Sequence, residues 1–334
     1  MLICEKCFAD NEMRSEVVSY ATSEGVCEVS QLQGKLIDSS WFSDFFEALL
    51  LLFELSEEGM PVADIVQQDW HLFSNNRIAE VLLNETLQSL SLVFKIKDNV
   101  DYSIDIKERV GIWERLKKNV KEESRFFTNL DEFERYNYLT KGDKNLVVDT
   151  ILYRSRITPY GREILETSEM GCPPPNLATA GRANPLGIPY LYLSDSAQAT
   201  YFEVRAVYLD RLSVGKFRIS QPLDLVDFCY DINLYLSYVD GDTSLKEVVI
   251  KKKIINRISR DLSKPLRRYD SKIEYVPTQL ICEFCKEYVR ADGICFESSL
   301  YRGGLNYVLF NPQTARCIDV ECHEITKINI DIDH

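Results

Sequence analysis

The sequence predicts an α+β protein with a helical N-terminal half and a C-terminal half in which short strands alternate with helices. Three observations indicate this. Apolar residues recur at three- and four-residue spacing within residues 39–140, as on one face of a helix. After residue 146, β-branched and aromatic runs are separated by Gly/Pro turns. The segment 140–145 (Thr-Lys-Gly-Asp-Lys-Asn) has the composition of a linker. We therefore expect a cysteine-bearing segment at 1–38, a helical domain at 39–140 and a third domain at 146–325.

Composition argues against several classes of protein. The length of 334 residues suits two domains. The net charge of −13 argues against broad binding to nucleic acid or to anionic membranes. The most apolar run, Phe45–Leu55, contains two glutamates and is too short to span a bilayer. No secretory signal is expected at the N-terminus, so we expect the ten cysteines to be reduced thiols of a cytoplasmic protein.

The N-terminal segment carries Cys4-x-x-Cys7 and, after nineteen further residues, Cys27. This spacing is typical of zinc sites, but the fourth position, three residues after Cys27, is Ser30, and serine is a poor zinc ligand. Two interpretations stay open. One is a structural zinc site that another residue, such as His71, completes. The other is a degenerate site whose cysteines pack as small apolar side chains.

The helical domain is expected to contain three helices. The first would bury a face made of Trp41, Phe42, Phe45, Phe46, Leu49 and Leu52. It would end at the breaker Gly59-Met60-Pro61, a second helix would begin near Ile78, and a third would run from about Lys107 to Glu123. No residue of this domain stands out as catalytic.

The third domain opens with an expected strand, Ile151–Ile157. Side chains alternate along a strand, so Arg154 and Arg156 should project to the same side. Two guanidinium forks on one face suit a diphosphate, because they match phosphate oxygens with paired hydrogen bonds. The alternative is an exposed strand face with solvated charges.

A Gly/Pro-dense loop follows at Gly181–Pro189, and it would let the backbone approach a ligand and anchor Arg182. The loop leads into an expected strand from Tyr190 to Leu193. There Tyr192 could stack on a flat aromatic ring or simply pack in the core.

The next helix is expected to start at Ser194-Asp195, with Gln198 forming a capping box. One face of this helix would carry Ala199, Phe202, Glu203 and Ala206. A carboxylate among such side chains is costly to bury unless something uses it. Glu203 is therefore the first candidate for catalysis, and the alternative is a glutamate paired with Arg205 or another cation.

Near the C-terminus, Pro277 should lie in the first turn of a helix. That helix would bury Cys282 and Cys285 rather than present them as a redox pair. A strand from Ile294 should end at Ser298, beside a glycine-rich bend. No histidine lies near Ser298 in the sequence, so a Ser-His-Asp hydrolase is disfavoured.

These motifs together resemble the RES domain, a family named for its Arg, Glu and Ser. The resemblance covers roughly residues 146–310 and rests on Tyr153-Arg154, Gly181-Arg182-Ala183-Asn184, Tyr192-Leu193 with Glu203 eleven residues on, and Asp292-Gly293-Ile294 leading to Ser298. The N-terminal half is similar to the HEPN-related region that precedes some RES domains.

The resemblance implies a fold like that of ADP-ribosyltransferases, with a split, curved sheet and an NAD cleft. It implies cleavage of NAD between nicotinamide and ribose, by phosphorolysis or hydrolysis, in a toxin that an antitoxin restrains. Its catalytic residues would be Glu203, Arg154, Tyr192 and Ser298, although Ser299 leaves the register of the serine open. Its NAD-binding residues would be Arg154, Arg156, Arg182, Asn184, Tyr192 and Ser298.

Two other functions remain in view. An enzyme of the same fold could transfer ADP-ribose to a protein. A non-enzymatic module could bind nucleic acid or other anions through Lys246–Lys272, which holds ten basic and three acidic residues on an expected amphipathic helix. The N-terminal half could sense a trigger or build a homodimer.

Overall fold

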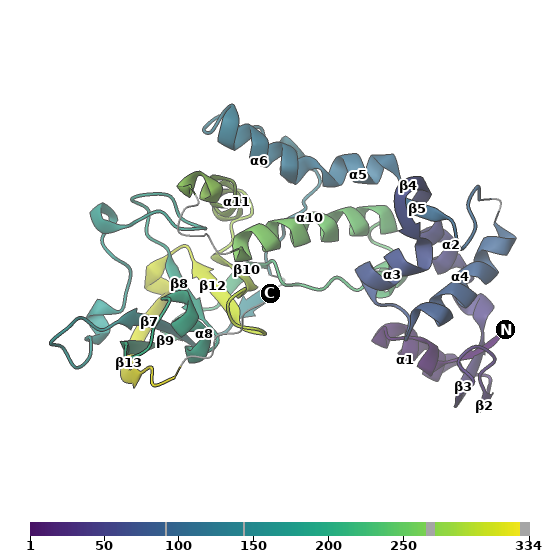
Figure 1. Cartoon of the computed structure of the whole chain (residues 1–334), viewed down its shortest axis with the longest axis horizontal. Coiled ribbons are helices and arrows are strands. Elements are labelled where there is room, and N and C mark those ends of the chain that lie inside the picture. The colour runs from purple at the N-terminus through teal and green to yellow at the C-terminus, as the bar shows by residue number, and fades with distance from the viewer. Residues whose placement is uncertain (91, 143, 265–270, 328–334) are drawn as a thin grey trace. The chain divides into compact units, whose positions relative to one another are not determined.

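The computed structural model describes residues 1–90, 92–142, 144–264 and 271–327, and the chain forms two compact units (Figure 1). The first unit comprises Met1–Gly111 with Asp231–Lys253, and the second comprises Ile112–Tyr230 with the chain from Ile254 onward. The boundary therefore lies at residue 111 and not in the expected linker at 140–145. None of the described helices has the length and apolar content that a membrane span requires.

The reason for this earlier boundary is helix α6 (Ile112–Glu122), which belongs to the second unit. Its indole Trp113 Nε1 donates a 2.7 Å hydrogen bond to Asp261 Oδ2, and Lys117 forms an ion pair with the same carboxylate at 2.8 Å. The third expected helix is thus two helices, α5 (Ile104–Val110) and α6, which separate at Gly111.

The first unit contains two small antiparallel sheets, one in the order β1-β3-β2 and one of β4 with β5. Its strands are β1 (Leu2–Cys4), β2 (Ser23–Val26), β3 (Gln33–Asp38), β4 (Phe53–Pro61) and β5 (Asn99–Tyr102). Its helices are α1 (Asn11–Tyr20), α2 (Ser43–Leu50), α3 (Val62–Trp70), α4 (Asn76–Ser89), α5, α9 (Leu234–Asp240) and the first half of α10 (Leu245–Ser263).

The helical periodicity of this unit is confirmed at α2, which buries Phe45, Phe46 and Leu49, and at α4. Trp41, which was expected on the same buried face, lies before α2 and is exposed. The expected breaker Gly59-Met60-Pro61 lies instead in strand β4. A glycine is required there because a Cβ at Gly59 would approach the carbonyl oxygen of Val100 to 2.1 Å. The pairing of β4 with β5 joins residues that are distant in the sequence, so the spacing of apolar residues within one segment does not predict it.

The second unit is built on one eight-stranded sheet in the order β13-β9-β7-β8-β12-β11-β10-β6, with β10 and β11 parallel and the other pairs antiparallel. Its strands are β6 (Lys144–Leu146), β7 (Ile151–Ile157), β8 (Leu191–Ser194), β9 (Arg211–Ile219), β10 (Leu223–Asp227), β11 (Gly293–Glu297), β12 (Leu305–Leu309) and β13 (Ala315–Glu324). Its helices are α6, α7 (Asp131–Arg135), α8 (Ala197–Glu203), α11 (Val276–Glu287) and the end of α10.

Strands β7 and β8 are barely joined. Seven residues of β7 pair with β9, but only Tyr153 pairs with β8, opposite Ser194. The sheet therefore opens between these two central strands, and a side chain from either face can enter the gap.

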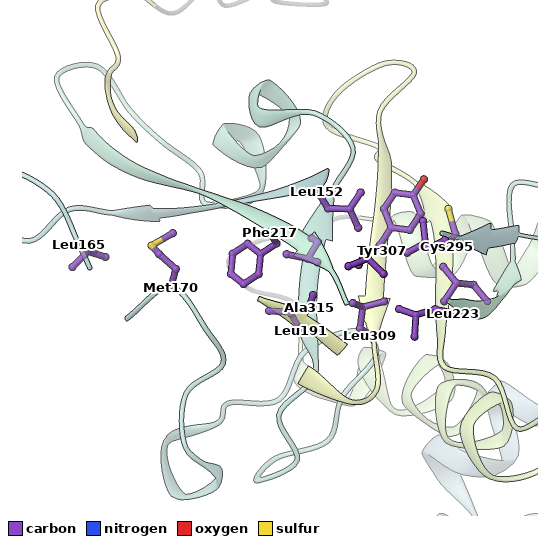
Figure 2. Close-up of a cluster of buried hydrophobic side chains, with 14 residues drawn as sticks. Leu152, Leu165, Met170, Leu191, Phe217, Leu223, Cys295, Tyr307, Leu309 and Ala315 are labelled. Atoms are coloured by element: carbon purple, nitrogen blue, oxygen red, sulfur yellow. The ribbon is translucent and has the colours of Figure 1, made fainter. Parts of the chain in front are cut away.

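One cluster of buried apolar side chains in this unit comes from alternate residues of neighbouring strands. Figure 2 shows Leu152, Phe217 and Leu191 gathered with Tyr307 and Leu309. These residues come from β7, β9, β8 and β12, and each is at most 4% exposed. Burial of this apolar surface holds the two sides of the opened sheet in place.

Candidate active site

A cavity of about 660 Å³ lies in the second unit, where β7 and β8 separate. Its walls come from β7, β8, α8, β11, β12, the loops before β8 and after β11, and Tyr275. The lining residues are Tyr153, Arg154, Ser155, Arg182, Tyr192, Leu193, Ser194, Thr200, Phe202, Glu203, Val204, Arg205, Tyr275, Phe296, Leu300 and Asn306. The size suits a dinucleotide or a part of one.

Glu203 is the last residue of α8, and one of its carboxylate oxygens is fixed. Oε1 accepts hydrogen bonds from Asn306 Nδ2 at 2.9 Å and from Ser298 Oγ at 3.3 Å. Oε2 forms no hydrogen bond with the residues that the structure describes. Glu203 is exposed at the cavity and is not buried among the apolar residues of its helix face. The carboxylate is thus oriented by two neutral donors while its second oxygen stays available.

Helix α8 begins differently from the expectation. Its N-cap is Ser196, and no capping box forms. Asp195 instead accepts the backbone N–H of Leu305 at 3.0 Å, and Gln198 accepts the hydroxyl of Tyr301 at 2.8 Å. Both bonds tie the start of α8 to the stretch from Ser298 to Asn306, which runs from the end of β11 into β12 and carries the two donors to Glu203.

Ser298 lies directly after β11 and is 7% exposed. Its Oγ accepts the backbone N–H groups of Leu300 and Tyr301 at 3.4 and 3.3 Å and donates to Glu203. Ser298 does not line the cavity, so its role in this structure is to hold the carboxylate of Glu203 in position. The neighbouring Ser299 donates to a backbone carbonyl elsewhere, and Ser298 is therefore the serine that contacts Glu203.

Arg154 lines the cavity from β7, and its Nη1 is buried without a hydrogen-bond partner among the described residues. Burial, together with the charge of Arg156, lowers the pKa of Arg154. An anion beside this guanidinium would relieve both penalties. By strand alternation Arg154 shares the face of Leu152, whereas α8 contacts the opposite face through the buried pair Ser155 and Thr200.

Arg156 projects to the same side as Arg154, as expected, but it does not reach the cavity. Its Nη2 donates to the carbonyl of Gly171 at 2.5 Å, and the adjacent Cys172 contacts Arg154. The pair of arginines therefore also holds the loop that contains Gly171. Of these two arginines, only Arg154 lines the cavity.

Arg182 also lines the cavity, and Nη1 is held by the carbonyls of Leu262 and Ser263, at 3.1 and 3.2 Å, at the end of α10. Cations are favoured at this end of a helix, where the last carbonyls lack partners. Thr278 donates to the backbone carbonyl of Arg182 at 2.7 Å, so α11 fixes the loop as well. Arg182 is thus held in a fixed position, as expected, by contacts with the end of α10 and the start of α11.

Tyr192 places its ring in the cavity wall and its hydroxyl in the loop. The hydroxyl accepts from the backbone of Ala183 at 3.0 Å and donates to Asn184 Oδ1 at 2.8 Å. Burial raises the pKa of Tyr192, so the phenol stays protonated. Asn184 is 5% exposed, outside the cavity lining, and donates to three loop carbonyls. Asn184 shapes the loop in this structure, and its expected contact with a ligand stays a prediction.

Comparison with known proteins adds an identity to this geometry. The family model described as the RES domain matches residues 151–331, which is more than half of the chain. The chain belongs to the RES domain family. The match begins at the first residue of β7 and includes Arg154, Glu203 and Ser298.

Among solved structures, the RES domain protein is similar to a chain in the crystal structure of the M. tuberculosis MbcT–MbcA toxin–antitoxin complex. The identity is 14%, the match covers 57% of this chain and 90% of that one, and the TM-score is 0.32. No curated protein sequence matches the chain.

Asn306 is a site residue of the RES domain that sequence reasoning missed. It lies on β12, is 7% exposed, and lines the cavity while donating to Glu203. A signal was present, because Asn306 is a polar residue in the otherwise apolar strand Leu305–Leu309. A buried amide needs a hydrogen-bond partner, but the sequence does not identify that partner.

Outside the RES domain, the sulfur atoms of Cys4, Cys7 and Cys27 lie within 4.8 Å of one another, and all three cysteines are fully buried. His71 is not part of this group. It is exposed, and its Nδ1 lies 3.1 Å from the carbonyl of Gln67. The suggestion that His71 completes a zinc site is therefore wrong. Cys282 and Cys285 are fully buried, as expected.

The basic segment is less available for anions than its composition suggests. Within the first unit, Lys252 pairs with Asp231 and Lys253 with Asp69, both at 2.7 Å, and Lys246 pairs with Asp105. Residues 265–270 of the segment lie outside the described part of the chain. These carboxylates already neutralise three lysines of α10.

Proposed function

We propose that this RES domain cleaves NAD at the bond between nicotinamide and ribose. The observation that carries the proposal is the pairing of two groups in one cavity. Among the residues that the structure describes, Arg154 offers a buried guanidinium nitrogen without a hydrogen-bond partner, and Glu203 offers a carboxylate with one oxygen fixed and the other open. A dinucleotide has a group that can bind to each of these side chains: its pyrophosphate can bind to the arginine, and a ribose hydroxyl can bind to the carboxylate.

Glu203 would act on the reacting ribose. Breaking a glycosidic bond to nicotinamide gives the ribose oxocarbenium character. A carboxylate held by Asn306 and Ser298 needs little reorganisation as that positive charge develops, and such preorganisation is a large source of catalysis. Oε2 can accept a ribose hydroxyl, because within the described part of the chain the hydrogen bonds to this carboxylate go to Oε1.

Arg154 would bind the pyrophosphate, with Arg182 as a second cation across the cavity wall. Fork-shaped guanidinium groups bind phosphate oxygens in pairs. The ring of Tyr192 would stack on the nicotinamide, since Tyr192 lines the cavity and its hydroxyl is already bonded to the loop.

Phosphate or water would accept the ADP-ribose. Transfer of ADP-ribose to a protein is the alternative. The exposed position of Glu203 is compatible with it, because a macromolecular nucleophile could reach the site. Membership of the RES family supports a further proposal, that the protein is a toxin whose NAD consumption an antitoxin restrains.

We also infer that Cys4, Cys7 and Cys27 bind a zinc ion in the first unit. Three thiols gathered in a buried group match the soft donors that zinc prefers. The ion would stabilise that unit and take no part in NAD cleavage.

The test is product analysis with NAD labelled in the adenosine part. The purified chain is incubated with NAD, with and without phosphate, and the products are separated by mass spectrometry. Free ADP-ribose indicates hydrolysis, and its 1″-phosphate indicates phosphorolysis. Label on protein would favour transfer, and intact NAD under all conditions would contradict the proposal.

A further inference from the structure

Two turns of the same length meet in the first unit. The turn Cys4-x-x-Cys7 follows from the end of β1, and the turn Cys27-x-x-Ser30 follows β2. β1 and β2 flank the same strand, β3. Each turn presents one side chain at its start and another three residues later, which is the spacing by which pairs of ligands hold a tetrahedral zinc ion.

Two distances between these side chains are close to those expected for ligands of one tetrahedral ion. Zinc–sulfur bonds of about 2.3 Å at tetrahedral angles place two sulfur atoms about 3.8 Å apart. The Sγ atoms of Cys7 and Cys27 are 3.5 Å apart. A sulfur and an oxygen on the same ion would be about 3.5 Å apart, and Cys4 Sγ lies 3.3 Å from Ser30 Oγ. The Ser30 hydroxyl thus lies beside the group, at a distance from Cys4 Sγ that two ligands of one ion can have.

The surroundings suit thiolates. The backbone N–H of Ser30 donates to Cys27 Sγ at 3.3 Å, which would stabilise negative charge on that sulfur. Ser30 is partly buried, and the three cysteines are fully buried. No carboxylate or histidine of the described residues joins the group, so Ser30 is the side chain placed to complete it.

We propose that Ser30 is the fourth ligand, so that the first unit holds one zinc ion through three thiolates and a hydroxyl. The inference rests on the zinc site proposed above. A hydroxyl is a weaker zinc ligand than a thiolate, so the ion should leave this site faster than it would leave four cysteines. Zinc availability would then set the stability of the first unit, because structural zinc contributes directly to folding.

The experiment uses the full chain, stripped of metal under reducing conditions and titrated with Co²⁺, which reports thiolate ligation by its visible and near-ultraviolet absorption. We compare the unsubstituted chain with Ser30→Ala, Ser30→Cys and Cys27→Ala. Cys322→Ser is the matched control, because Cys322 is an exposed thiol on β13. Zinc release to a chelator is then timed for each variant that binds metal.

We expect one Co²⁺ per chain with a tetrahedral spectrum, unchanged in Cys322→Ser and lost in Cys27→Ala. Ser30→Cys should raise the sulfur charge-transfer absorption by about one third, since four thiolates replace three. It should also slow zinc release at least about tenfold, because even outer partners of a ligand change metal affinity by that much. Ser30→Ala should alter the spectrum and speed zinc release.

The outcomes separate the two proposals. If the unsubstituted chain binds neither Co²⁺ nor Zn²⁺, the zinc site itself is overturned, and the assignment of Ser30 fails with it. If the chain binds one ion while both Ser30 variants keep its spectrum and release rate, zinc binds but Ser30 is not a ligand. The Ser30 variants keep this second test decisive even if Cys27→Ala does not fold.

Discussion

Asn306 Nδ2 lies 2.9 Å from Glu203 Oε1, and this hydrogen bond joins strand β12 to the end of helix α8 across 103 residues of sequence. The amide is buried and neutral, so it orients the carboxylate without competing for the charge of a substrate. Ser298 donates to the same oxygen. Glu203 is therefore fixed from one side and open on the other.

Replacing Asn306 with leucine should lower kcat for NAD cleavage about tenfold to a hundredfold. Leucine has a similar size but cannot donate, so the carboxylate would lose its stronger anchor, and small misplacements of catalytic groups cost rates of this order. KM should change little, because Arg154 and Arg182 remain. The exposed Asn176→Leu serves as the control. Unchanged kcat in Asn306→Leu would show that Asn306 does not position Glu203.

Arg154→Lys should raise KM for NAD about tenfold to a hundredfold. Lysine keeps the charge but loses the planar fork that binds phosphate oxygens in pairs. Steady-state kinetics give the measurement, and Arg162→Lys, which alters an exposed ion pair outside the cavity lining, gives the control. Equal KM values in the two variants would mean that Arg154 does not bind the pyrophosphate.

Gly181→Ala should destabilise the loop that holds Arg182. A Cβ at Gly181 would lie 2.6 Å from Asn184 Oδ1 and 2.8 Å from the Tyr192 hydroxyl, so the hydrogen bond between them would have to break or shift. We expect a loss of about 1–3 kcal/mol in the free energy of unfolding, as for other overpacked sites, together with weaker NAD binding.

Gly171→Ala is the matched control for this variant. Nothing lies within 4 Å of a Cβ built at Gly171, so denaturant unfolding should be nearly unchanged there. If Gly181→Ala unfolds at the same denaturant concentration as Gly171→Ala, the tight packing of the loop is not a source of stability.

The sequence predicted much of the second unit because its signals are local. The strand Ile151–Ile157 and the first-turn position of Pro277 follow from alternation and from proline geometry, and both are confirmed. Glu203 and Arg154 were predicted as site residues from the sequence, and both line the cavity.

Long-range contacts account for what local patterns did not predict. The capping box predicted at Gln198 does not form, because Asp195 accepts a hydrogen bond from Leu305, a residue of β12 that lies more than a hundred residues away in the sequence. Asn184 and Ser298 were expected at the ligand, yet their side chains are used to hold Tyr192 and Glu203. Such partners depend on how distant strands pair, which one sequence does not encode in a readable pattern.

The central claim is that Glu203 drives cleavage of NAD in this cavity, and nicotinamide release tests it most directly. The rate is measured for the unsubstituted chain and for Glu203→Gln, with NAD binding followed in parallel by calorimetry. Glutamine keeps the shape and an oxygen for Asn306 but lacks the charge, so we predict that release falls by about a thousandfold while NAD still binds. Nicotinamide release at the same rate from both proteins would contradict the account.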